Sequence, residues 1–146
     1  MSDSPNWIKA RLECTPDKIF AALYAQIEED LRKFNRLSHA SRNGRRFILQ
    51  KQDNAISVFH AKMIDDHQTM SGKRVIVDSD YDQDFLSVEL DENAFISRRQ
   101  EHVLLRIYPR WNPDTLTCDL CIEDQAIPLW NVVGRILEPF FFGDLG

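Results

Sequence analysis

Residues 15–36 read TPDKIFAALYAQIEEDLRKFNR, and this stretch carries the clearest structural pattern in the chain. Its apolar residues recur at spacings of three and four, which places them on one face of a helix. They are Phe20, Leu23, Tyr24, Ile27, Leu31 and Phe34. Thr15 suits the cap position, and Pro16 suits the first turn because the N–H that proline lacks has no partner there. The stretch predicts an amphipathic helix that packs against another element.

The segments that follow this helix favour short β-strands, because they combine alternating polarity with β-branched residues. We expect six strands, at residues 45–50, 55–63, 74–78, 85–90, 102–108 and 116–122. Residues 52–54 (Gln-Asp-Asn) are expected to form a hairpin turn. Residues 109–113 begin and end with proline and are expected to form a loop, because proline lacks the donor that a strand ladder needs.

A second helical pattern begins near Pro128. Its expected core face consists of Leu129, Trp130, Val133, Ile136 and Leu137. Pro139 should stop or kink this helix, because it interrupts the hydrogen-bond ladder. The following FFF at 140–142 is too apolar for water, so we expect it to fold back under the sheet or to dock on a second copy of the chain.

Helix, strand meander and helix, without alternation of strands and helices, predict the α+β class. We expect an antiparallel meander sheet of about five or six strands, with the N-terminal and C-terminal helices packed on one face. The 146 residues contain no repeat or linker, so residues 1–146 are predicted to be a single domain. No apolar run approaches the length of a membrane span, so no membrane association is expected.

The chain has 18 Lys and Arg residues and 23 Asp and Glu residues, which gives a formal net charge of −5. This mild acidity does not indicate any particular class of partner. Its three cysteines are an odd number and suit a reducing compartment better than a disulfide framework. With no secretory signal at the N-terminus, this predicts a cytoplasmic protein. Cys118 and Cys121 lie three apart on an expected strand, so their side chains face opposite sides and are poorly placed to bind one metal ion. We expect Cys118 to be buried and Cys121 to be exposed or half-exposed.

An acidic stretch at residues 78–84 provides one candidate metal site. Asp78, Asp80, Asp82 and Glu89 have the spacing of positions one, three, five and twelve of an EF-hand calcium loop. Gln83 stands where that loop needs glycine, and the flanking residues read as strands. The alternative is a hydrated hairpin connection. Ca²⁺ is the one cofactor that the sequence brings into consideration.

Residues 32–51 contain basic residues and no acid. A polyanion or a nucleic acid is therefore a second class of partner. The candidate anion-binding residues are Arg42, Arg45, Arg46 and Lys51. The alternative is that these side chains complement the helix dipole or face water, and the acidic total disfavours a dedicated nucleic-acid binder.

The sheet face opposite the helices is a candidate protein-binding surface. Its predicted partner-binding residues are Arg46, Ile48, His102, Leu104, Arg106, Tyr108 and, in the expected loop, Trp111. The alternative is an ordinary half-solvated sheet, since single exposed apolar residues are common.

No catalytic motif is present: G-x-S-x-G, G-x-x-x-x-G-K and paired helical histidines are all absent. Residues 65–67 (Asp-Asp-His) suit either a general base or a polar loop. The sequence therefore favours a non-enzymatic interaction domain, adaptor or chaperone-like, that binds another protein or a second copy of itself. Its plan resembles the small acidic chaperones of bacterial secretion systems, although those have a helix within the meander that this sequence lacks, and no family is assigned.

Overall fold

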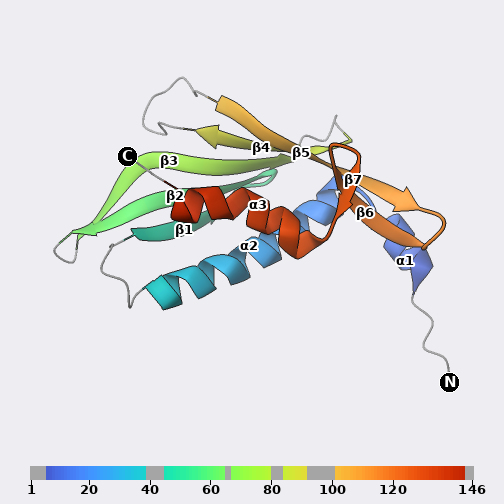
Figure 1. The fold of residues 1–146 in the computed structure, drawn as a ribbon, viewed down its shortest axis with the longest axis horizontal. Coiled ribbons are helices and arrows are strands. Elements are labelled where there is room, and N and C mark those ends of the chain that lie inside the picture. Colours follow the sequence, from blue (N-terminus) through green and yellow to red (C-terminus); the bar gives the residue numbers. More distant parts are fainter. Residues whose placement is uncertain (1–5, 39–44, 65–66, 80–83, 92–100, 144–146) are drawn as a thin grey trace.

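The computed structural model describes residues 6–38, 45–64, 67–79, 84–91 and 101–143. A curved sheet wraps around two helices that lie on one of its faces (Figure 1). The elements in chain order are α1 (Trp7–Leu12), α2 (Pro16–Ser38), β1 (Arg45–Lys51), β2 (Ala55–Ile64), β3 (His67–Ser79), β4 (Leu86–Asp91), β5 (Glu101–Asn112), β6 (Thr117–Ile122), β7 (Gln125–Ile127) and α3 (Leu129–Phe142). The predicted antiparallel α+β architecture is confirmed.

The sheet has seven strands in the order β1-β2-β3-β4-β5-β6-β7, one or two more than expected. The six predicted strands are present, and β7 is the additional one. It pairs with β6 across a two-residue turn in which Glu123 and Asp124 both adopt positive φ, at 51° and 65°. Turns of this kind match the twist of the two strands they join, but they usually contain Asn or Gly. Glu-Asp lacks that signature, so this hairpin was not predicted.

The hydrophobic core lies between α2, α3 and the concave face of the sheet. The predicted stripe of α2 is confirmed, since Phe20, Leu23, Ile27 and Leu31 are all buried. Ile136 and Leu137 of α3 are buried opposite them, but Trp130 is 66% exposed, so its predicted place in the core is wrong. In the first turn of α3 it is the neighbouring Leu129 that packs against the core.

The C-terminal aromatic residues belong to α3 itself rather than to a tail after it. The helix continues through Pro139 to Phe142. Phe140 and Phe141 are buried against Phe47 of β1, with ring centroids 5.1 and 4.7 Å away. This packing places Phe140 and Phe141 on the sheet, which is the first of the two predicted arrangements.

Residues 109–112 form the end of β5 instead of the expected loop. Pro109 is paired with Leu120 of β6. The pairing of β5 with β4 already ends at Ile107, so this part of β5 has a described neighbour on one side only. Because only alternate residues donate toward that neighbour, a strand of this kind accommodates a proline.

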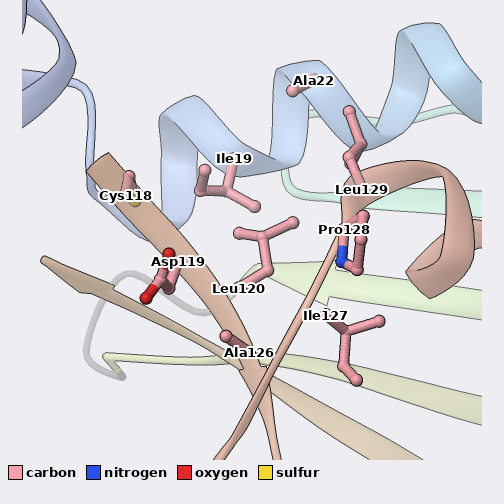
Figure 2. A pocket seen from close by; sticks show the side chains of 9 residues that line it. All are labelled: Ile19, Ala22, Cys118, Asp119, Leu120, Ala126, Ile127, Pro128 and Leu129. Carbon is pink, nitrogen blue, oxygen red and sulfur yellow. The ribbon is translucent and has the colours of Figure 1, made fainter. Parts of the chain in front are cut away.

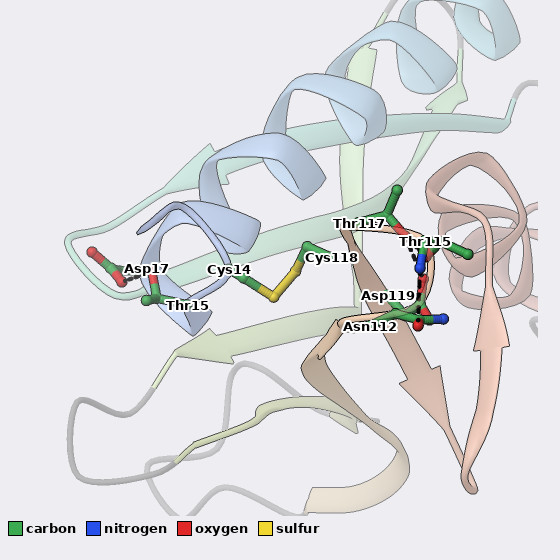
Figure 3. The surroundings of a disulfide bond; sticks show 8 residues. All are labelled: Cys14, Thr15, Asp17, Asn112, Thr115, Thr117, Cys118 and Asp119. Atoms are coloured by element: carbon green, nitrogen blue, oxygen red, sulfur yellow. Dashed lines mark hydrogen bonds between the residues drawn. A yellow bond between two sulfur atoms is a disulfide. The ribbon is translucent and has the colours of Figure 1, made fainter. Parts of the chain in front are cut away.

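Two cysteines form a disulfide, contrary to the expectation of reduced thiols (Figure 3). Cys14 lies between α1 and α2, and Cys118 lies at the start of β6, with a Cα–Cα distance of 5.4 Å. Cys121 is the free thiol and is buried, so its predicted exposure is wrong, and Cys118 is half-buried rather than buried. The contact joins residues 104 positions apart and depends on tertiary packing that local patterns do not reveal.

Candidate interaction surface on β5

A bulge in β5 places two neighbouring apolar side chains on the surface. The register with β4 shifts between Val88 and Glu89, which pair with Leu105 and Val103, so Leu104 is the extra residue. A bulge interrupts the alternation of a strand. As a result Val103 and Leu104 are both exposed, at 53% and 48%.

Arg106, Tyr108 and Arg110 of β5 continue this surface, together with Phe85, which directly precedes β4. The Arg106 guanidinium lies 5.0 Å from the ring centroid of Phe85. The Phe85 and Tyr108 centroids are 5.2 Å apart, and the Arg110 guanidinium lies 5.9 Å from the Tyr108 ring. Each exposed cation–π contact contributes about 0.5–1 kcal/mol, enough to hold these side chains along the strand.

These side chains share the face that is turned away from the helices, because Leu105 and Ile107 between them pack into the core. We call this set the β5 surface. It consists of Phe85, Val103, Leu104, Arg106, Tyr108 and Arg110. Arg110 also forms an ion pair with Asp124, with Nη1 3.0 Å from Oδ1, so Arg106 is the cation on this surface without a described carboxylate partner.

The structure unites only part of the predicted partner-binding set. Leu104, Arg106 and Tyr108 lie together, but Arg46 and Ile48 lie on β1, with three strands between β1 and β5. Four strand spacings correspond to about 19 Å along the sheet. The side chain of His102 lies outside what the structure describes.

Trp111 does not belong to the same surface. It is half-buried, and the Arg11 guanidinium of α1 lies 5.4 Å from its ring centroid.

The middle of the sheet face that is turned away from the helices is not exposed. Ser57, Ile76, Glu89 and Asp91 on this face are buried. Exposure on this face is therefore local rather than continuous across the sheet.

The candidate anion-binding residues form no cluster among the described side chains. Arg42 and the side chain of Arg45 lie outside the described residues. Arg46 and Lys51 are both exposed but point to opposite faces, because they are an odd number of positions apart on β1. Lys51 lies on the helix side, with its Nζ 4.8 Å from the centroid of the Tyr24 ring.

The candidate calcium site is only half described. Asp80 and Asp82 lie outside the described residues, as do Asp65 and Asp66 of the candidate general base. Asp78 on β3 pairs with Ser87, two residues from Glu89 on β4, and the flanks are strands as expected. The described residues contain no group of three or more metal-binding side chains. Calcium binding stays a prediction.

An apolar cavity of about 390 Å³ lies between α2, the β6–β7 hairpin and the start of α3 (Figure 2). Its apolar lining includes Ile19, Ala22, Leu120, Ile127 and Leu129. The one charged lining residue, Asp119, accepts hydrogen bonds from Asn112 Nδ2 at 3.2 Å and Thr117 Oγ1 at 3.4 Å (Figure 3). The cavity thus lacks the convergent polar groups that mark a catalytic pocket.

The edge of strand β1 is capped at Phe47 by a side chain of α2. Asn35 Nδ2 donates to the Phe47 carbonyl at 3.0 Å, and the Phe47 N–H donates to Asn35 Oδ1 at 3.2 Å. The amide thereby occupies two backbone groups that would otherwise attract another strand. This edge is a less favourable docking site than the β5 surface.

Comparisons of the chain with known protein families, curated proteins and solved structures find no match. Among the described residues, no helix has both the length and the apolar character needed to cross a membrane.

Proposed function

We propose that this chain is a non-enzymatic protein-binding domain, adaptor or chaperone-like, that holds an extended segment of another protein against the β5 surface. The observation that carries this proposal is the joint exposure of Val103 and Leu104 beside the row of arginine and aromatic side chains. Arginine and tyrosine are enriched among the residues that dominate binding energy at protein interfaces, and Val103 and Leu104 add exposed apolar area beside Arg106 and Tyr108.

The side chains of the β5 surface indicate what kind of partner segment would bind there. Val103 and Leu104 favour apolar side chains, and Arg106 favours a carboxylate within reach of the same segment. Each of the two aliphatic side chains is about half exposed, so burying the rest of both contributes about 2 kcal/mol, or about thirtyfold in Kd. An extended segment with both apolar and acidic residues fits these requirements.

Site-specific cross-linking in the native host tests this proposal. A photoreactive amino acid at Leu104 should give one major protein adduct, and the same group at Ala25, exposed on α2, should not. Arg106→Glu should suppress the Leu104 adduct, whereas Lys18→Glu, a matched reversal on α2, should leave it unchanged. Equal adducts at both positions, or an adduct indifferent to Arg106→Glu, would contradict the proposal.

The disulfide bears on where such binding takes place. Disulfides are rare in cytosolic proteins, so the Cys14–Cys118 bond argues against the cytoplasmic location expected from the sequence and favours an oxidising compartment. Alkylation of denatured but unreduced protein from its native host, followed by mass spectrometry, distinguishes the two locations. An oxidising compartment leaves one alkylated cysteine, and a cytoplasmic location leaves all three.

A further inference from the structure

The outward face of α3 combines exposed aromatic residues with opposite charges. Trp130, Gly134, Glu138 and Phe142 follow one another at intervals of four residues, which places neighbours along the same side of the helix. Trp130 is 66% exposed and Phe142 is 70% exposed. The core-facing side of α3 supplies six buried residues. Phe142 also contacts Phe34 of α2, with ring centroids 5.7 Å apart, but most of its surface stays exposed.

Gly134 leaves the helix backbone accessible in the middle of this face. A Cβ atom built at Gly134 meets nothing within 4 Å, so no neighbouring group among the described residues requires glycine. Glycine inside a helix costs roughly 0.5–1 kcal/mol relative to alanine. The distance between packed helices depends on the side chains at their contact, and glycine permits a close approach.

Arg135 and Glu138 give this face a charge pattern that complements itself. Both are exposed, and neither forms an ion pair within the described structure. Arg135 Nε donates to Asn131 Oδ1 at 2.9 Å, which keeps the guanidinium on the outward face. A two-fold axis between positions 135 and 138 of antiparallel helices places each Arg135 beside the partner's Glu138.

We propose that a second copy of this chain docks on α3, antiparallel and related by this two-fold axis. The arrangement forms the Arg135–Glu138 pair twice and brings Trp130 toward the partner's Phe142. A helix of 14 residues is about 21 Å long, so the interface is smaller than the roughly 800 Å² per partner of a standard complex. The dimer is therefore expected to depend on concentration. It leaves the β5 surface accessible, because that surface lies on the other face of the sheet.

Sedimentation equilibrium over micromolar to near-millimolar concentrations tests the dimer by a charge swap. Glu138→Arg and Arg135→Glu should each raise the dimer Kd by about tenfold or more, because each replaces two attractions with two repulsions. The double variant Arg135→Glu/Glu138→Arg should restore dimerisation. Lys18→Glu on α2 is the matched control and should leave the Kd unchanged. A wild-type monomer at every concentration, or a double variant that fails to recover, overturns the proposal.

Gly134→Leu provides a second test that does not depend on charge. The leucine has open space in the monomer, so the helical circular dichroism and Tm of the monomer should be preserved. The same side chain should block the close approach of the partner helix and abolish the dimer. A folded Gly134→Leu variant that dimerises like the wild type contradicts this packing.

Discussion

Removing the Cys14–Cys118 disulfide should cost this domain a large part of its stability. The bond joins residues 104 positions apart, so it excludes the most open conformations of the unfolded chain. In the chain-entropy description, a closed loop of this length contributes about 4.7 kcal/mol at 25 °C. Since the free energy of unfolding of an ordinary domain is only about 5–15 kcal/mol, the reduced protein should be only marginally stable.

Urea unfolding followed by circular dichroism measures this effect. With a slope of about 2 kcal/mol per molar urea, the loss should lower the unfolding midpoint by about 2 M. The variant Cys14→Ser/Cys118→Ser should behave like reduced wild type, and a reducing agent should not shift its midpoint further. If oxidised wild type and the double serine variant unfold at the same urea concentration, the reasoning from chain entropy is wrong for this protein.

Three further predictions concern single positions. Asn35→Ala should destabilise the domain by about 1–3 kcal/mol in urea unfolding, because it leaves the Phe47 N–H and carbonyl without the amide, and a midpoint within error of wild type would contradict this. Gly134→Ala should raise the unfolding free energy of the monomer by about 0.5–1 kcal/mol, and a lower value would show that the glycine is needed within the chain. A hydrogen bond from Thr15 lowers the pKa of Asp17, so this carboxylate adds a little stability that is lost as the pH falls below about 4. NMR titration of Thr15→Val should return the Asp17 pKa toward its ordinary value, and an unchanged pKa would assign the effect to another cause.

The longer regular elements were predictable because their periodicity is local, whereas the short α1 and β7 were not predicted. The α2 stripe is visible in the sequence, and each predicted strand alternates or is rich in β-branched residues. The departures arise where tertiary contacts decide. Pro109 fits in β5 because this part of the strand has a described neighbour on one side only. In the first turn of α3, Leu129 rather than Trp130 packs against the core, and the disulfide depends on how the segment after α1 meets β6.

The candidate surface was predictable in part for the same reason. Leu104, Arg106 and Tyr108 alternate, so their common face follows from the strand alone. Val103 joins them only through the bulge, and Phe85 only through contacts between β4 and β5, neither of which a single segment reveals. Strand order is a global property, which is why β1 and β5 residues were grouped although the meander separates them.

The disulfide also has a mechanical consequence. Tension applied from α1 to α3 passes from Cys14 directly to Cys118, so α2 and strands β1 to β5 bear no load while the bond is intact. At about 3.5 Å per residue, the bypassed segment hides about 360 Å of contour length. Stretched in optical tweezers, the oxidised domain should rupture with a short extension, and a reductant should add that hidden length to each event.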